Sequence, residues 1–482
     1  MARDEEQWII EVNREMMKSG DTSCSSSSWS WSWVSKVNNQ VNKLSETRSA
    51  ESKRWQTQSI YWIPGTVKEL CSSSTTSYHP QMVSIGPYHH GNPHLEAMED
   101  HKHRALLNFL QRSKTPLHSY VKALLPVAKD FMEAYGRSPQ NEMKDIEAFL
   151  QMMILDGCFI LEIMRMSTAT PEGLVEMGYA ANDPVFSNHG KLCFVPYLKR
   201  DMLMLENQLP LQVLVLLLLV EDGALMLDDL SKQDHLTALI LKFFSQPHEM
   251  GNIKDYSGCL HILDLYRKSL LLDPCRKRKQ KERTCDSDCL PGRGINKGDV
   301  VYIGSATELM EAGIRLKPSK TKNLNDITFE GGVLKLPVVV VDDALESGYL
   351  NLMAFERFHV GAGNDVTSYV FFMDKLIDSA KDVSLLQSCG ILQNSLGSDK
   401  AVARLFNSLS RDVSLDSDSW LGVVHKMVSD YCEMPVPRWM AYAKHNYFTN
   451  PWVGMSIVAA IWLFALTGIQ TFYTVLSYYH PS

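Results

Sequence analysis

The longest run of apolar positions lies near the C-terminal end of the chain, at Val453–Leu476. No Asp, Glu, Lys or Arg follows Lys444. About 20 helical residues cross the roughly 30 Å hydrocarbon layer of a bilayer, and Pro451 stands where a helix start tolerates a missing N–H. Aromatic residues flank the run, as they do at membrane interfaces: Tyr447, Phe448, Trp452, Phe472, Tyr473, Tyr478 and Tyr479. The pattern predicts one C-terminal transmembrane helix, with a very apolar core helix as the alternative.

Before that run, apolar residues recur mostly every three or four positions, the spacing of helices with one buried face. Helices are predicted at Leu95–Arg112, Glu142–Met166, Arg200–Val220, Ser305–Ala312, Gly348–Phe358, Asp365–Ser379, Lys381–Cys389, Asp399–Asn407 and Trp420–Cys432. Within the third, Leu211–Val220 is too short to span a bilayer and is predicted to be a buried core helix. Residues 327–341 carry β-branched residues around two glycines, which predicts a hairpin. The predicted fold class is mainly α with a small β element: a large helical domain plus one C-terminal transmembrane helix.

Composition divides the chain into three predicted segments. Residues 1–58 combine a short helix at 1–17 with a Ser/Trp-rich stretch at 19–35. Disorder is favoured for that stretch over a strand face or a peptide motif built on its alternating tryptophans. Residues 59–445 form the helical domain, which is interrupted by a polar, basic surface loop at 274–296. Residues 446–482 form the membrane anchor.

The distribution of charge limits the partners and predicts a topology. A net charge of −7 argues against a nucleic-acid-binding protein, which needs a basic surface. The basic run Arg276–Arg283 is interpreted as a solvated loop, with anionic lipid binding or nuclear import as alternatives. The N-terminal residues lack a signal-peptide pattern, and Arg438 and Lys444 precede the anchor while no basic residue follows it. We therefore expect the bulk of the chain in the cytosol, at the plasma membrane or an endomembrane.

The ten cysteines are too few for a disulfide scaffold in a chain of 482 residues. Most lie among apolar residues, so Cys158, Cys193 and Cys259 are predicted to be reduced and buried. Cys285 and Cys289 form a Cys-x3-Cys pair, but no second pair stands at zinc-ribbon spacing. No metal site is predicted there.

The densest group of candidate metal ligands lies within residues 79–103. It contains His79, His89, His90, His94, His101 and His103, with Glu96, Glu99 and Asp100. A metal site needs three or four converging ligands. Adjacent histidines point apart in most backbones, and His101 and His103 would face different sides of a helix. The favoured interpretation is that these histidines hydrogen-bond to turns and helix ends, so no metal or cofactor site is predicted.

Two acidic residues, Asp156 and Glu206, interrupt strongly apolar segments. A buried carboxylate must be paired or hydrogen-bonded, or its pKa shifts. Structural ion pairs, for example with Arg104 or Arg165, and hydrogen bonds from neighbouring backbone are favoured over a catalytic acid/base pair. The chain has no Gly-x-Ser-x-Gly, phosphate-loop or dinucleotide-binding motif. No catalytic residue is assigned.

Several sequence blocks occur in a specific order along the chain. They include SIYWIPGTVKEL, SYHPQMVSIGPYHHGNPHLEAMEDHK, MILDGCFILEIMR, RDMLMLENQLPLQVL, FEGGVLKLPVVVVDD and YFTNPWVGMSIVAAIWLF. From Ser59 to Tyr479 the chain resembles the plant DUF247 family, also called UPF0481. It departs at His103, where the family often has Trp, and at Leu211-Gln212, where the family often has two Phe.

The resemblance implies a plant-specific, single-pass membrane protein with a mainly helical domain of unknown biochemistry. Family members have been linked to pollen–stigma self-incompatibility in grasses and, more loosely, to growth and stress responses, and no catalytic residues are established for the family. The preferred hypothesis is a tail-anchored protein-interaction or signalling component, with the lipid bilayer and unidentified proteins as partners and no nucleic acid. The rival hypothesis is a hydrolase or metal-dependent enzyme that uses the His79–His103 region with Asp156 or Glu206.

Overall fold

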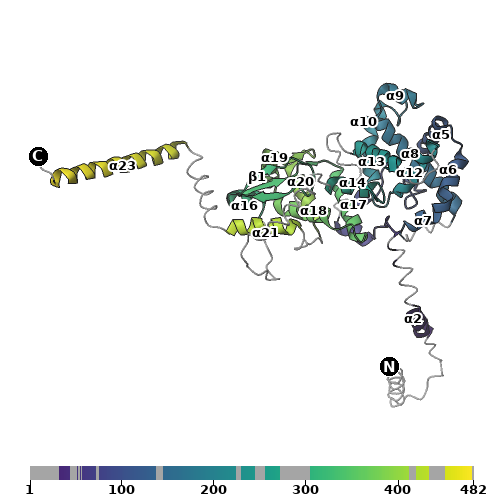
Figure 1. The fold of residues 1–482 in the computed structure, drawn as a ribbon, viewed down its shortest axis with the longest axis horizontal. Coiled ribbons are helices and arrows are strands. Elements are labelled where there is room, and N and C mark those ends of the chain that lie inside the picture. Colours follow the sequence, from purple (N-terminus) through teal and green to yellow (C-terminus); the bar gives the residue numbers. More distant parts are fainter. Residues whose placement is uncertain are drawn as a thin grey trace, which may run out of the picture. The chain divides into compact units, whose positions relative to one another are not determined.

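The computed structural model describes residues 32–43, 52, 55, 57–71, 75–136, 145–223, 230–244, 256–271, 304–411, 420–433 and 451–479 (Figure 1). The chain separates into two units, Met1–Gln56 and Thr57–Ser482. In the first unit, helix α2 spans Ser32–Asn42 and exposes Trp33. The end of the 19–35 stretch is therefore helical, not disordered. The predicted helix at 1–17 and the basic loop at 274–296 lie outside the described residues.

Helix α8, Ile146–Thr168, is the centre of a first hydrophobic core. Its N-cap residue, Asp145, accepts a hydrogen bond from the Glu147 N–H at 2.9 Å. All residues from Met152 to Met164 are buried, because this helix is apolar on nearly every side and must be covered all round. It is contacted by α5 (Glu99–Ser113), α6 (Leu117–Leu124), α7 (Ala128–Glu133), α12 (Leu211–Glu221) and α13 (Leu230–Phe244). The burial of α12 confirms the predicted core helix.

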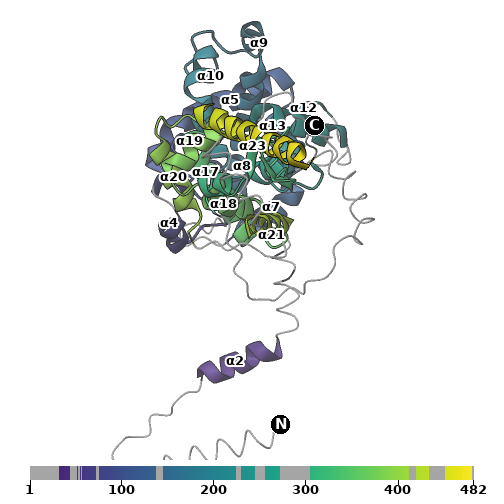
Figure 2. The ribbon, with the colours of Figure 1, turned by 90° about the vertical axis from the view of Figure 1, so that its left-hand side faces the viewer.

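A second core combines helices with two small sheets, and its helices, drawn in green, are grouped together in Figure 2. Its helices are α16 (Ala306–Glu311), α17 (Leu345–Phe358), α18 (Asp365–Leu376), α19 (Ala380–Ser388), α20 (Asp399–Leu409) and α21 (Trp420–Glu433). In the first sheet, β3 (Val333–Leu336) runs parallel to β1 (Arg315–Pro318) and antiparallel to β2 (Thr328–Glu330). In the second, β4 (Val339–Val341) runs parallel to β5 (Leu392–Asn394). The hairpin prediction is confirmed for β2 and β3, whereas the strands β1 and β5 were not predicted.

Short elements connect and flank the two cores. They are α4 (Gly65–Cys71), η1 (Thr75–Tyr78), η2 (Pro93–Met98), η3 (Leu125–Val127), α9 (Pro171–Glu176), α10 (Asn188–Cys193), α11 (Val195–Met202) and α14 (Ile262–Leu271). Helix α14 contributes Ile262 to the first core and Leu263 to the second. The two cores therefore belong to one continuous framework within the second unit.

The predicted single helix Arg200–Val220 is wrong. Helix α11 ends at Met202 and α12 begins only at Leu211, after Pro210 in the N-cap position. Proline lacks the N–H that a continuing helix needs. Between the two helices, polar side chains bind backbone groups of other segments, which stabilises a turn where the apolar pattern alone would continue the helix.

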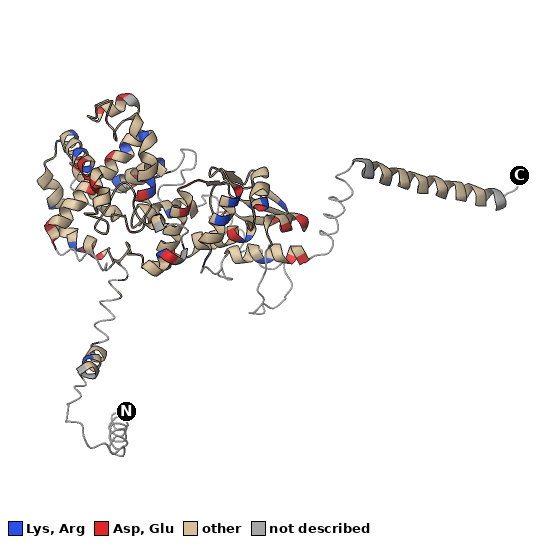
Figure 3. Cartoon of the chain, turned by 180° about the vertical axis from the view of Figure 1, so that it is seen from behind, with Lys and Arg blue, Asp and Glu red and all other residues tan. Residues whose placement is uncertain are grey.

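Helix α23 spans Pro451–Tyr479 and starts at the predicted proline. Its stretch Val458–Leu476 is long and apolar enough to cross a membrane, with a mean hydropathy of 1.5. Described side chains in that stretch are exposed, unlike those of the core helices, and Figure 3 shows no charged residue along it. The hydroxyl of Thr467 donates to the Leu463 carbonyl at 2.8 Å, which satisfies a polar group within the helix itself.

Cys158, Cys193, Cys259 and Cys389 are free thiols. Cys158 and Cys259 are buried, as predicted, but Cys193 is exposed, so the prediction for that residue is wrong. The reason is local: α10 is a short helix that begins at the Ser187 cap and also exposes the neighbouring Leu192 side chain. The apolar sequence around Cys193 therefore does not mark a core position.

Candidate functional site

The turn between α11 and α12 is held by three consecutive buried side chains, Glu206, Asn207 and Gln208. Asn207 accepts from the Ile85 N–H at 2.6 Å through Oδ1 and donates through Nδ2 to the Val83 carbonyl at 3.0 Å. The Gln208 amide donates to carbonyls within its own turn, and its Oε1 accepts from the Leu263 N–H at 3.1 Å. These bonds satisfy backbone groups that would otherwise be buried without a partner. The turn therefore fixes segments from distant parts of the sequence.

Glu206 is the charged member of this turn. Its Oε1 accepts from the Ile63 N–H at 2.7 Å, and Lys68 Nζ lies 2.9 Å from the carboxylate. The Lys68 ammonium also lies 4.6 Å from the centre of the Trp62 ring, a cation–π contact. The prediction that Glu206 forms a structural ion pair is confirmed, but its partner is Lys68 and not one of the two suggested arginines.

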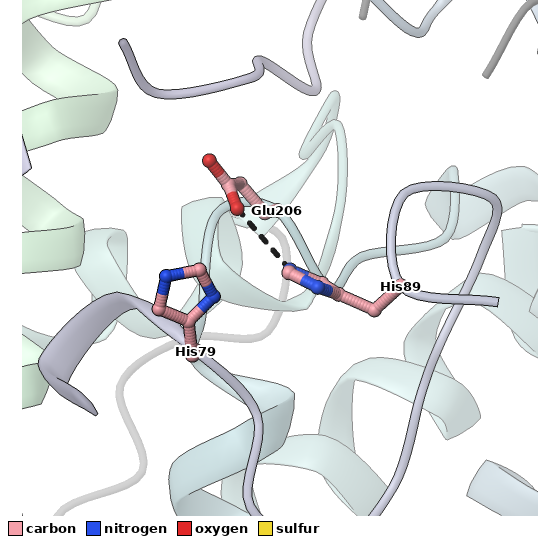
Figure 4. A group of neighbouring side chains, drawn as sticks. All are labelled: His79, His89 and Glu206. Atoms are coloured by element: carbon pink, nitrogen blue, oxygen red, sulfur yellow. Dashed lines mark ion pairs between the residues drawn. The ribbon is translucent and has the colours of Figure 1, made fainter. Parts of the chain in front are cut away.

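Two of the six histidines converge on Glu206 (Figure 4). His89 is buried and its Nε2 lies 3.2 Å from Glu206 Oε2, while the His79 and His89 rings meet edge to face at 5.8 Å. One potential ligand atom from each of these three residues lies within 4.8 Å of the others. Burial, and then the charge of Lys68, lower the pKa of His79, while the Glu206 carboxylate opposes that shift.

A pocket of about 450 Å³ adjoins this group. His79 lies in its wall, together with Thr76, Pro80, Gln81, Met82, His94 and Tyr197. The group is therefore buried on the side of His89 and Glu206 and reaches solvent on the side of His79.

The other four histidines of the region do not join this group. His90 and His103 are exposed. The backbone N–H of His94 donates to the Asn92 side chain at the start of η2, and His101 Nδ1 lies 2.8 Å from the Arg104 guanidinium. The prediction that His89 and His90 point apart is confirmed, because one is buried and the other exposed.

Asp156 forms a separate buried ion pair with Lys102, at 2.7 Å. Lys102 is fully buried and also reaches Glu99 at 2.7 Å and the Ser84 carbonyl at 2.5 Å. The second carboxylate oxygen of Asp156 accepts from the Gly86 N–H at 2.8 Å. Burial raises the pKa of Asp156, and the nearby ammonium and the Gly86 N–H oppose that shift. Asp156 therefore has its own lysine and backbone partners and does not share those of Glu206.

The two arginines suggested as partners lie elsewhere. Arg104 pairs with Asp183, and Arg165 pairs with Glu221 at 2.5 Å. The partner lysines, Lys68 and Lys102, carried no sequence signal, because each occurs in an ordinary mixed-charge helix. The suggested partners Arg104 and Arg165 are therefore wrong, while the structural nature of the pairing is confirmed.

The glycine at position 86 explains how its loop approaches the turn formed by Glu206, Asn207 and Gln208. Gly86 has a φ of +71°, and a Cβ placed there would lie 2.8 Å from the Gln208 carbonyl oxygen. A side chain would therefore be strained both in its own backbone and against its neighbour. Its N–H is thereby directed at Asp156.

These features define a mainly helical protein with two joined hydrophobic cores, a polar turn at their junction and one helix that is able to cross a membrane. The chain belongs to the DUF247 family, described as plant protein of unknown function, whose family model matches residues 60–466. A UPF0481 protein of Arabidopsis thaliana is 30% identical over 437 residues, which cover 87% of this chain and 86% of that protein. A second UPF0481 protein of the same plant is 25% identical over 508 aligned positions, covering 87% and 91%. No solved structure matches the chain.

Proposed function

We propose that this chain is a membrane-anchored component that works by binding other proteins, with its helical unit in the cytosol. The observation that carries the proposal is α23, whose stretch Val458–Leu476 is uncharged and exposed and has the length of a membrane span. The preceding residues Arg438 and Lys444 favour a cytosolic location for the helical unit. A role in signalling, which the family resemblance implies, fits a protein of this kind.

The state of the buried acids supports binding over chemistry. Asp156 and Glu206 each contact a lysine ammonium and a backbone N–H, at distances of 2.7–2.9 Å. A general acid or base must exchange a proton with a substrate within hydrogen-bond reach. Carboxylates with these contacts stabilise the fold and are not available for proton transfer. The helical unit would therefore act by binding partner proteins through its surface.

The anchor is tested by ending the chain after Asn450. We expect the truncated protein to remain in the soluble fraction after a carbonate wash, while the full chain stays with the membrane pellet. A glycosylation acceptor added after Ser482 should be modified and one added before Met1 should not. A truncated protein that still pellets contradicts the anchor, and the opposite glycosylation pattern contradicts the cytosolic location. Proximity labelling from the native membrane then identifies the protein partners.

A metal-dependent enzyme is a second candidate, favoured by one observation: His79, His89 and Glu206 converge beside a pocket. The enzyme hypothesis requires that the full chain turns over a substrate and that His79→Gln abolishes turnover at unchanged protein abundance. Loss of biological function together with loss of abundance supports the structural role instead.

A further inference from the structure

We propose that His79, His89 and Glu206 form a binding site for a divalent transition-metal ion, with zinc as the metal that fits the donor set best. Two imidazoles and one carboxylate are the ligands of several three-residue zinc sites, in which a fourth position stays open. Imidazole nitrogens suit zinc, and because two of the three ligands are imidazoles, the set is not the all-oxygen type that calcium or magnesium prefers.

The distances fit a tetrahedral ion. Zinc binds nitrogen and carboxylate oxygen at about 2.0–2.2 Å, which places neighbouring ligand atoms roughly 3.3 Å apart. The separation of 3.2 Å between His89 Nε2 and Glu206 Oε2 has this value without any movement. The other separations are within 4.8 Å, and His79 is the exposed member, with room to rotate toward the other two.

His89 supplies an independent observation. Its Nε2 is buried and has no hydrogen-bond partner among the described residues, although the Glu206 carboxylate lies nearby. A buried polar atom left without a partner costs free energy, so native structures rarely contain one without a reason. A bound ion would accept the lone pair of this nitrogen.

The surroundings of Glu206 resemble those of a metal ligand. The Ile63 N–H holds Oε1 at 2.7 Å and thereby orients the carboxylate, so that Oε2, which also accepts from Lys68 at 2.9 Å, faces His89. Hydrogen bonds from outside the ligand set orient metal ligands in this way. Because His79 also lines the pocket of about 450 Å³, the fourth position of the ion would face that pocket and take water or an anionic oxygen of a small ligand.

Lys68 opposes binding of the ion, so its removal should change the zinc affinity in a direction that tests the proposal. Its ammonium contacts the same carboxylate at 2.9 Å and repels a dication. The site therefore binds zinc less tightly than it would without Lys68. Replacing Lys68 by Met removes the competing charge, so a metal site gains affinity. A purely structural ion pair gains nothing from this substitution and only loses stability.

The test uses the full chain, purified in detergent without a histidine tag, stripped with a chelator and titrated with Zn²⁺ alone. Metal content is measured by mass spectrometry, affinity by competition with a chromophoric chelator, and geometry by the visible absorption of the Co²⁺ form. We expect one Zn²⁺ per chain. His79→Gln and His89→Gln should each lower the affinity at least about ten-fold, and Lys68→Met should raise it.

Matched controls are His90→Gln and His103→Gln, which remove exposed histidines outside the pocket wall and should leave the affinity unchanged. His79 is exposed, so its substitution tests the site without risk to folding, which a thermal melt confirms. The proposal is overturned by a chain that holds no stoichiometric Zn²⁺, by equal losses in the controls, or by an unchanged or lower affinity in Lys68→Met. It is also overturned if only a Cys285→Ser/Cys289→Ser variant loses the metal. Membrane association is independent of every outcome.

Discussion

His261 should make the folded protein sensitive to acid. Its ring is fully buried, with Nε2 3.1 Å from the Ser59 carbonyl and Nδ1 3.2 Å from the Asp264 N–H. These partners assign a neutral ring in which Nε2 donates and Nδ1 accepts. A proton added at Nδ1 would face another donor. Burial accordingly lowers the pKa of His261 from 6.5 to about 4.

The sign and size of the effect follow from linkage. Between pH 6.5 and 4 the unfolded chain binds a proton at this histidine and the folded chain does not, so the free energy of unfolding falls as pH falls. A pKa difference of about 2.5 units at roughly 1.4 kcal/mol per unit gives a loss of about 3 kcal/mol by pH 4. Above pH 6.5 the same histidine has no effect on the pH dependence. A loss of this size is a large fraction of the stability of an average domain.

The perturbation is His261→Gln, whose amide keeps a donor for the Ser59 carbonyl but does not titrate. Urea unfolding of the full chain in detergent, followed by tryptophan fluorescence from pH 7.5 to 4.5, gives the free energy at each pH. We expect the wild-type curve to fall more steeply than that of the variant, with a difference of about 2.5 kcal/mol accumulated by pH 4.5. Other histidines with lowered pKa values act on both curves, and exposed His90→Gln is the control. Parallel curves for wild type and His261→Gln would refute the reasoning.

Two further substitutions test the polar junction. Asp156→Asn should lower the free energy of unfolding, measured in urea, by about 3 kcal/mol, because it leaves the buried Lys102 ammonium without its main counter-charge. The control Glu99→Gln should cost less, because Glu99 is partly exposed. Normal stability of Asp156→Asn together with lost biological function would instead indicate catalysis. Gly86→Ala should lower the free energy of unfolding by about 1–3 kcal/mol, since φ is +71° and the new Cβ would press on the Gln208 carbonyl. Gly91→Ala is the control, because Gly91 has a similar φ but open space around it. An equal loss of stability in both variants would show that the contact with Gln208 contributes nothing.

The helices could be predicted because their signal is local. The periodic apolar spacing of α8, and of most helices after residue 345, is present in each segment by itself. The turn at residues 203–210 could not be predicted in the same way. Leu203, Met204 and Leu205 continue the helical pattern, and the bonds that replace the helix come from Ile63 and Ile85, far away in sequence. Strand β5 was missed for a similar reason, since its three residues pair only with the distant β4.

The candidate site, like the turn and β5, depends on contacts between residues that are distant in sequence. The sequence singled out the histidines and Glu206 separately, because polar residues stand out within apolar surroundings. It gave no reason to choose His79 and His89 from six histidines, or to join them with Glu206. That choice depends on the fold, which brings His79 and His89 to Glu206 from separate parts of the sequence. Burial and long-range pairing select the site, and neither can be seen in one segment of sequence.

The hydrogen bonds that fasten the segment after Thr57 also determine the order in which the protein can form during synthesis. The Ser77 carbonyl accepts from Asn351 across 274 positions, and Tyr61 meets His359 across 298. A ribosome makes proteins from the N-terminus, so this early segment must wait, with apolar Ile63 and Tyr78 uncovered, until residues near 359 emerge. Closing loops of this length is slow compared with helix formation. The nascent chain therefore passes through an interval in which this segment lacks its final partners, and an early stop codon yields a half that cannot complete its own core.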